Sequence, residues 1–330
     1  MTFQNCHSFR LRIDSFALSL LCLLRMANSP AYAQTVHLRA VGDILLGGPM
    51  ARVLEQKGRA YPFKAMRSTL RATDITFGNF ECSMSTRGKP IPKQFNFRAD
   101  PQYAPVLKEN GFTIVSTANN HTWDYGREAL QDTVQFVRKT GVLTVGAGSN
   151  RAQAHRLVVI TRKGLCIGFL AYLGLIPALI PESETLPSVS MASIEAIRTE
   201  VADAREQVDV LIVSLHAGQE GVPQPTPRQR GFAQAAIDAG ADLVIGHHPH
   251  VRQPLVIYHG KPICYSLGNF VFSTAGRGSG AMLDATLSRH HVVAHLVPLT
   301  LDGPQPRLTH IHTPSAPRGT QPQKSTEGTK

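Results

Sequence analysis

Three histidines stand close together in residues 246–250, which read Gly-His-His-Pro-His. The segment follows an apolar run at 241–245, which is typical of a buried strand. Neutral imidazoles are good ligands for transition metals, and in an extended chain the spacing of His248 and His250 places both on one side. Taken alone, the segment fits a metal-binding turn and a histidine-rich solvent loop equally well, because short motifs often match by chance.

Four other strand-like segments also end in side chains that bind metals or transfer protons. Their polar ends carry Asp43, then Asn79 with Glu81, then Asn120, His121 and Asp124, and then His216. Any one of these ends is ordinary, because aspartate and asparagine are common turn residues. The ends of parallel strands, however, meet at one edge of an α/β sheet, where such folds bind ligands. The five ends together therefore predict one shared metal site.

The mixture of carboxylate, amide and imidazole groups favours one or two divalent metal ions, of the Mn, Zn or Fe type. Two such ions about 3.5–4 Å apart can clamp a phosphate or carbonyl oxygen and supply hydroxide near neutral pH. The phosphate-binding pattern Gly-x-x-x-x-Gly-Lys-Ser/Thr and the nucleophile pattern Gly-x-Ser-x-Gly are both absent from the sequence. Their absence removes two competing kinds of active site.

The elements that must position these groups alternate between strands and helices. Helices are expected at residues 50–57, 62–72, 100–110, 127–139, 194–206 and 228–239. A hairpin at 157–161 and 165–172 and late strands at 262–266 and 291–297, the last ended by Pro298, add antiparallel pairs. The Pro-rich segment 174–190 is expected to be a surface loop. The pattern predicts an α/β fold with a largely parallel sheet and no internal domain boundary.

The composition of the 330-residue chain is that of a globular protein, with 42% hydrophobic and 17% charged residues. The formal net charge of +11 favours anionic partners. The basic residues are scattered and form no dense run, so a diffuse positive field around an anionic polymer is a better interpretation than a nucleic-acid interface. We therefore expect no nucleic acid partner.

The two ends of the chain are expected to lie outside the folded domain. A basic start with Arg10 and Arg12, an apolar core at 16–24 and a small-x-small pattern at 31–33 predict a signal peptide over residues 1–33, cleaved near Ala33. The protein is then exported to the periplasm or the extracellular space, with an uncleaved anchor as the alternative. The domain is expected to cover 34–313, and the Pro/Ser/Lys-rich residues 314–330 a disordered tail.

Three cysteines remain after the expected cleavage: Cys82, Cys166 and Cys264. Cys166 and Cys264 lie in apolar strand-like runs, so buried free thiols are expected. An exported protein could also form one disulfide, and the sequence does not say between which of the three.

Several motifs stand in an order that resembles a known family. They are Gly42-Asp43-Ile44-Leu45-Leu46-Gly47, Gly78-Asn79-Phe80-Glu81, Asn119-Asn120-His121-x-x-Asp124-x-Gly126, His216-x-Gly218, Gly246-x-His248-Pro249-His250 and Tyr265-Ser266-Leu267-Gly268-Asn269-Phe270. From about residue 36 to residue 272 the chain resembles the CapA-type poly-γ-glutamate capsule-biosynthesis family, a branch of the calcineurin-like metallophosphoesterase superfamily. The resemblance implies a four-layer α/β/β/α sandwich with mixed sheets and a metal site at one edge of the two sheets.

The resemblance also implies a role for each residue that matches a motif. The implied metal ligands are Asp43 on the first ion, Glu81 as a bridge, Asn120 and His216 on the second ion, and His248 and His250 on one ion each. His121 matches the histidine that protonates the leaving group, and Asp124 is close enough in sequence to orient it. His247 does not align with the paired ligands and is expected to be a bystander.

The sequence departs from the superfamily pattern near the first expected metal. A histidine normally stands two residues after the first aspartate, and this chain has Leu45 there. Glu81 is one methylene longer than the usual aspartate. Both changes resemble the CapA branch, and the loss of the histidine puts a full two-metal site in doubt. Ala217 and Gln219 stand where bulkier residues are usual, which would change the wall of the pocket.

Three further residues are candidates for substrate binding: Arg98, Asn79 and Glu220. Arg98 could clamp a carboxylate through two hydrogen bonds, or be an exposed arginine before a helix cap. Glu220 could support the ligands or be a surface charge. Asn269 is expected to hold a turn.

These observations favour an exported metal-dependent hydrolase or transferase that acts on an anionic polymer. The resemblance makes poly-γ-glutamate the candidate polymer and a capsule-synthesis membrane complex a candidate partner. The first alternative is a non-catalytic assembly or export factor that binds polyglutamate on the same fold. The second is a small-substrate metallophosphoesterase, against which Leu45 argues.

Overall fold

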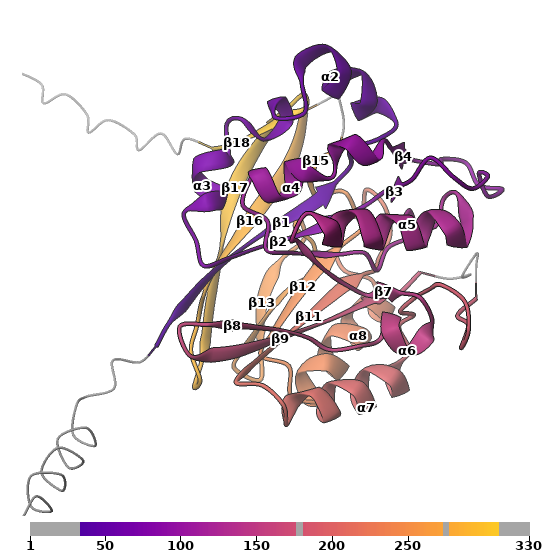
Figure 1. The fold of residues 1–330 in the computed structure, drawn as a ribbon. Coiled ribbons are helices and arrows are strands. Elements are labelled where there is room, and N and C mark those ends of the chain that lie inside the picture. Colours follow the sequence, from indigo (N-terminus) through magenta and orange to yellow (C-terminus); the bar gives the residue numbers. More distant parts are fainter. Residues whose placement is uncertain (1–33, 176–180, 273–276, 310–330) are drawn as a thin grey trace, which may run out of the picture. The chain divides into compact units, whose positions relative to one another are not determined.

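The computed structural model describes residues 34–175, 181–272 and 277–309, and these form two mixed β-sheets with flanking helices (Figure 1). The expected signal segment 1–33 and the expected tail 314–330 lie outside the described residues. None of the helices in the described ranges is long and apolar enough to cross a membrane.

The first sheet has eight strands and carries the N-terminal half of the expected site. Its strands, in order across the sheet, are β18 (Gln305–Leu308), β17 (Val292–Asp302), β16 (Arg277–Leu287), β1 (Val36–Ile44), β2 (Ile75–Phe80), β5 (Ile114–Ser116) and β6 (Leu143–Val145), and β15 (Asn269–Val271) also pairs with β1. The pairs from β1 through β6 are parallel, whereas β16, β17 and β18 pair antiparallel.

The second sheet has six strands and carries the histidines of the C-terminal half. Its order is β13 (Leu255–Tyr258), β14 (Lys261–Cys264), β12 (Leu243–His247), β11 (Val210–His216), β9 (Leu165–Leu173) and β8 (Val158–Arg162). The central pairs β9–β11, β11–β12 and β12–β14 are parallel, and the expected hairpin is present as the antiparallel pair β8–β9. Two small ladders join β10 (Ser188–Val189) to β7 (Ala147–Gly148) and β3 (Ser83–Met84) to β4 (Arg98–Ala99).

Three apolar cores separate four layers, so the expected α/β/β/α sandwich is confirmed. The central core lies between the two sheets, where the rings of Phe77 and Phe169 stack at 5.8 Å. A second core joins the first sheet to helices α2 (Pro49–Lys57), α3 (Arg67–Arg71), α4 (Pro105–Glu109) and α5 (Gly126–Lys139). A third core packs α7 (Ile194–Arg205) and α8 (Pro227–Asp238) on the second sheet, and the short α6 (Arg151–Ala154) contacts β7 and β10 (Figure 1).

Two helices expected to be continuous are interrupted. The segment 62–72 is a 3₁₀ turn at Tyr61–Phe63 followed by α3, and the segment 100–110 is a 3₁₀ turn at Pro101–Tyr103 followed by α4. Asp100 caps the second segment as expected, because its side chain accepts from the backbone N–H of Gln102. Pro105 has no N–H to donate, so the helix restarts there instead of continuing from Pro101.

The expectation that Pro298 ends a strand is wrong, because β17 continues through it to Asp302. The Pro298 carbonyl accepts from the Thr309 N–H at 3.1 Å and so faces away from β16. In an antiparallel strand the nitrogen of the same residue points the same way, so the missing N–H removes no hydrogen bond from the β16–β17 ladder. Asn269 does not hold a turn either, since it begins β15 and pairs with Asp43 of β1.

The segment 174–190 is more ordered than a surface loop in its described part. It contributes β10, and Glu182 forms an ion pair with His155. The other ring nitrogen of His155 lies 2.8 Å from the Glu200 carboxylate of α7. This polar cluster ties the loop to the second sheet, because the Tyr172 hydroxyl of β9 donates to Glu200 at 2.9 Å.

The three remaining cysteines are unpaired in the described ranges, as the free-thiol expectation has it. Cys264 is buried as expected, and Cys82 is buried too. The expectation that Cys166 is buried is wrong, because this residue is partly exposed.

Candidate metal centre

The two sheets meet at the carboxyl ends of β1 and β12, and glycine makes this approach possible. A side chain at Gly42 would lie 1.8 Å from the Gly268 carbonyl oxygen, and one at Gly246 would lie 1.9 Å from the Tyr265 carbonyl oxygen. Both strand ends therefore rest directly on the backbone of residues 265–268, and only glycine permits this distance.

The candidate ligands form a cluster with an acidic half, Asp43 and Glu81, and an imidazole half, His216, His248 and His250. Asn79 lies at the centre of the acidic half. Strand pairing places it beside Asp43. Its side-chain nitrogen lies 2.8 Å from Asp43 Oδ1, 3.0 Å from Glu81 Oε2 and 3.2 Å from His216 Nδ1. The amide donates to both carboxylates and so holds them in position without a bound cation.

The imidazole half comes from the ends of β11 and β12. His216 Nε2 lies 2.8 Å from the Asn120 side-chain oxygen and 3.5 Å from Glu81 Oε1. His250 Nδ1 lies 3.2 Å from Asp43 Oδ2 and 2.9 Å from the Asn269 side-chain oxygen. The structure thus brings together residues from five separate strand ends, as the sequence predicted.

The turn that carries the last two histidines is not the extended segment that the sequence suggested. His248 and His250 have φ angles of +97° and +58°, a backbone region that residues other than glycine seldom adopt. This strained backbone directs both imidazoles to the cluster, with ring centroids 5.8 Å apart. Strain of this kind is often retained where function requires it.

The donor atoms of the cluster fit a divalent cation. Three groups of residues each place one ligand atom apiece within 4.8 Å of one another: Glu81, His216 and His248; Asp43, Glu81 and His250; and Glu220, His248 and His250. Among the described residues, Glu81 Oε1 and His248 Nδ1 are buried without a hydrogen-bond partner. Unpartnered buried groups are costly, so a cation held by these atoms would resolve both.

Burial sets the protonation of the cluster. It lowers the pKa of His216 well below the ordinary value and lowers that of His248 to about 3. Both imidazoles are therefore neutral, which is the state that binds metals. Burial and the adjacent Asp43 charge raise the pKa of Glu81, whereas for Asp43 the contacts with His247 and His250 outweigh burial and hold the pKa well below its usual range.

His247 is closer to the site than the sequence suggested. Its Nδ1 lies 3.5 Å from Asp43 Oδ1, its ring is fully buried, and neither ring nitrogen has a hydrogen-bond partner in the part of the chain that the structure describes. Leu45, at the position where the sequence resemblance predicts a histidine, is fully buried in the apolar core with the helices. Because the sequence has leucine there, a first ion would have one candidate ligand fewer.

His121 and Asp124 form a pair next to the cluster. His121 Nδ1 lies 2.7 Å from Asp124 Oδ2, and the carboxylate also accepts from the Phe97 backbone N–H at 2.5 Å. Burial lowers the pKa of His121, and Asp124 opposes this change. Asn119, beside the expected ligand Asn120, fixes the same turn by accepting from the His121 backbone N–H at 3.1 Å.

Lys93 contacts both members of this pair, and the sequence did not indicate that role. It forms a salt bridge with Asp124, lies 3.1 Å from His121 Nδ1 and donates to the Asn120 carbonyl oxygen at 2.8 Å. It stands in a polar loop without regular spacing, so neither periodicity nor a motif could have predicted the contact.

The remaining substrate-binding candidates lie at the periphery. Arg98 is exposed, and its guanidinium stacks on the Tyr125 ring at 4.2 Å instead of facing a carboxylate. Glu220 is also exposed, but its carboxylate is within reach of His248 and His250. The substrate roles of Arg98, Asn79 and Glu220 stay predictions.

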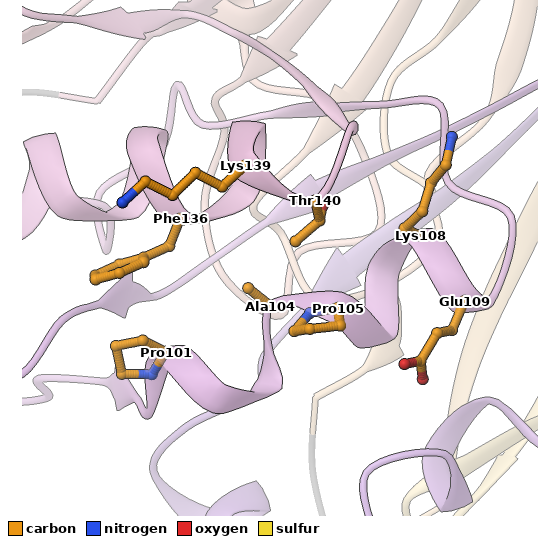
Figure 2. A pocket seen from close by; sticks show the side chains of 8 residues that line it. All are labelled: Pro101, Ala104, Pro105, Lys108, Glu109, Phe136, Lys139 and Thr140. Atoms are coloured by element: carbon orange, nitrogen blue, oxygen red, sulfur yellow. The ribbon is translucent and has the colours of Figure 1, made fainter.

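A separate hollow of about 390 Å³ lies between α4 and α5. Figure 2 shows Phe136 and Pro101 facing each other across it, with Lys108 and Lys139 nearby. None of its lining residues belongs to the metal-ligand cluster, so the hollow is distinct from the candidate site.

Comparison with known proteins gives a family for this fold and site. The model of the family described as "Bacterial capsule synthesis protein PGA_cap" matches residues 37–274. The PGA biosynthesis protein CapA of Bacillus subtilis (strain 168) is 34% identical over 255 residues, 76% of this chain and 66% of that protein. The capsule biosynthesis protein CapA of Bacillus anthracis is 30% identical over 282 residues, 81% of this chain and 68% of that protein.

The chain spans about two thirds of the length of these two relatives. A solved structure, that of a hypothetical protein from Thermus thermophilus, shares the fold with a TM-score of 0.52 and 16% identity, over 81% of this chain and all of that chain. The matched residues 37–274 contain every residue of the candidate site. Because the family model matches most of the chain, the chain belongs to the bacterial capsule synthesis protein PGA_cap family.

Proposed function

We propose that this chain acts in the biosynthesis or processing of poly-γ-glutamate or a related capsule polymer, as a metal-dependent hydrolase or transferase. The observation that carries the proposal is the cluster of buried Asp43, Glu81, His216 and His248 with half-buried His250, whose unpartnered donor atoms fit a divalent cation. The names of the two CapA relatives support the polymer, and the net charge of +11 suits a polyanion.

A divalent ion in this cluster would polarise the carbonyl or ester group and lower the pKa of water. The chain's own residues would do the rest. Asn79 holds the two carboxylates in position, and Asp124 holds the His121 ring so that Nε2 is free to give a proton to the leaving group. Burial lowers the pKa of His121, which favours the neutral ring. An anionic substrate beside the ring would raise that pKa again, so that the ring takes a proton from water and can then donate it from Nε2.

Two measurements test the proposal. Elemental analysis after loading with Mn²⁺ or Zn²⁺ should give at least one ion per chain. Poly-γ-glutamate turnover should fall about 10²- to 10⁴-fold in His121→Ala, the usual contribution of a general acid. His259→Ala is the matched control, because His259 is an exposed histidine on the β13–β14 turn. Activity that survives His121→Ala unchanged would contradict the assignment.

A non-catalytic assembly or export factor is the second candidate, and Leu45 is the observation that favours it. An apolar side chain fills the position of one expected ligand, so a first ion would have fewer groups to hold it. In that case the chain binds metal and polymer but shows no turnover of poly-γ-glutamate or of p-nitrophenyl phosphate.

The proposal includes export to the periplasm or the extracellular space, where a capsule-synthesis membrane complex would be the partner. The basic and apolar pattern of residues 1–33 supports it. The test is the N-terminal sequence of the secreted protein, which should begin at Gln34. A chain recovered from the cytosol with its N-terminus intact would contradict export.

A further inference from the structure

Three phenylalanines form a continuous aromatic ledge beside the metal-ligand cluster. Phe272 lies against His250 with ring centroids 4.4 Å apart, and Phe97 lies against His121 at 4.5 Å. Phe97 and Phe272 meet edge to face at 6.0 Å, and Phe95 stacks on Phe97 at 6.4 Å. The aromatic ledge, which is Phe95, Phe97 and Phe272, thus runs from the two imidazoles outward.

The outer end of the ledge is open to solvent. The Phe95 side chain is 57% exposed, and its ring stacks on Phe97, which in turn lies against His121. A single exposed aromatic ring needs no explanation, but this ring continues an apolar surface that reaches the candidate site. An apolar surface of this kind, adjacent to a charged centre, suits a ligand with both apolar and anionic parts.

The segment 91–97 that carries two of the rings is held in place by polar contacts. The Ile91 N–H donates to the Asp124 carbonyl oxygen at 2.9 Å, and the Asn96 side chain donates to the Ile91 carbonyl oxygen at 3.0 Å. Lys93 and the Phe97 N–H bind the Asp124 carboxylate. The rings are therefore positioned before a ligand arrives, which reduces the entropy cost of binding.

We propose that the aromatic ledge is the subsite for the methylene groups of a glutamyl polymer, and holds the chain on one side of the bond at the metal-ligand cluster. A γ-linked glutamyl chain has two methylenes in each main-chain repeat and one carboxylate beside them. The methylenes would lie on the ledge. Arg98, the next residue after Phe97, has no carboxylate partner among the described residues and is available to a pendant carboxylate.

This inference rests on the proposed function but is tested by binding, without turnover. Calorimetric titration of the full-length, Mn²⁺-loaded protein with a γ-linked glutamyl decamer should show about tenfold weaker affinity for Phe95→Ala, equivalent to about 1.4 kcal/mol. Phe95→Tyr should retain the affinity because the ring remains. Ile257→Ala is the matched control, since Ile257 is 65% exposed on β13, in the second sheet.

A polyphosphate of similar charge is the second probe, because it is polyanionic and has no methylenes. Its affinity should be the same for the wild type and Phe95→Ala. An equal loss for both ligands, or unchanged decamer affinity in Phe95→Ala, would overturn the ledge. The wild type failing to bind the decamer would also overturn it, whereas decamer binding without turnover would contradict only the catalytic part of the proposed function.

Discussion

Replacement of Lys93 by methionine is expected to destabilise the protein far more than the loss of a comparable surface ion pair. The Lys93 and Asp124 side chains are 12% and 0% exposed, so the substitution leaves Asp124 as a buried carboxylate without its cation. Breaking a buried pair by removing one partner costs about 3–5 kcal/mol. Because methionine keeps the apolar stem of the lysine, we expect a loss at the lower end of that range, from the missing charge alone.

Arg59→Met supplies the control. Arg59 pairs with Glu109 at 2.5 Å, but the two side chains are 44% and 35% exposed, and exposed pairs contribute at most about 1 kcal/mol. Urea unfolding should be followed by the fluorescence of Trp123, the single tryptophan, which is buried next to Asp124 in the sequence. The midpoint should fall clearly for Lys93→Met and little for Arg59→Met.

The double variant Lys93→Met/Asp124→Asn tests the reason for the loss. Burial lowers the pKa of Lys93 in spite of Asp124, so the desolvation of the ammonium group is larger than its stabilisation by the ion pair. Removing both charges should therefore recover most of the stability that either single variant loses. Additive losses in the double variant, or equal midpoints for Lys93→Met and Arg59→Met, would refute the reasoning.

Three other outcomes are expected. Asn79→Ala should weaken Mn²⁺ binding about 10- to 100-fold by calorimetry, because it frees the Asp43 and Glu81 carboxylates that Asn79 holds, and unchanged affinity would contradict this. Gly246→Ala should reduce the yield of folded protein, because the new methyl would lie 1.9 Å from a backbone oxygen. The control Gly231→Ala in α8 should be neutral or stabilising, because the nearest atom outside the helix backbone lies 3.9 Å from the new methyl. Neighbouring Glu182 and Glu200 raise the pKa of His155 from 6.5 to about 9 although burial opposes them, so its stabilisation is complete below pH 6.5 and is lost as the pH rises through 9. Relative to His155→Gln, the wild type should be about 1–3 kcal/mol more stable at about pH 6, with a difference that disappears near pH 10; a constant difference would refute the pairing.

The convergence of the candidate ligands could be predicted from the sequence because they lie at or within a few residues of strand ends. Asp43, His216 and His248 stand at or just after strand ends, and the geometry of α/β sheets makes such ends converge. The four-layer sandwich followed from the family resemblance and not from the spacing of the elements. Periodicity alone predicted a largely parallel sheet and did not separate the strands into two sheets.

What could not be predicted depends on contacts across the chain. Lys93 reaches Asp124 from a loop without periodicity, and the ring of Phe272 meets His250 from a distant strand end. The positive φ angles of His248 and His250 are imposed by tertiary packing, because local preferences disfavour them. Asparagine favours turns, so the sequence predicts a turn at Asn269, yet pairing with Asp43 makes this residue the start of β15.

The division of the candidate ligands between two sheets has a consequence for folding kinetics. Asp43 and Glu81 come from the first sheet and its loops, whereas His216 and His248 come from the second. A cation held by Glu81, His216 and His248 would bind only after the two sheets have docked, so we expect it to stabilise the native state more than the transition state. Metal loading should then slow unfolding and leave the folding rate almost unchanged. A chelator would act on the same step and should return the unfolding rate to that of the apo protein.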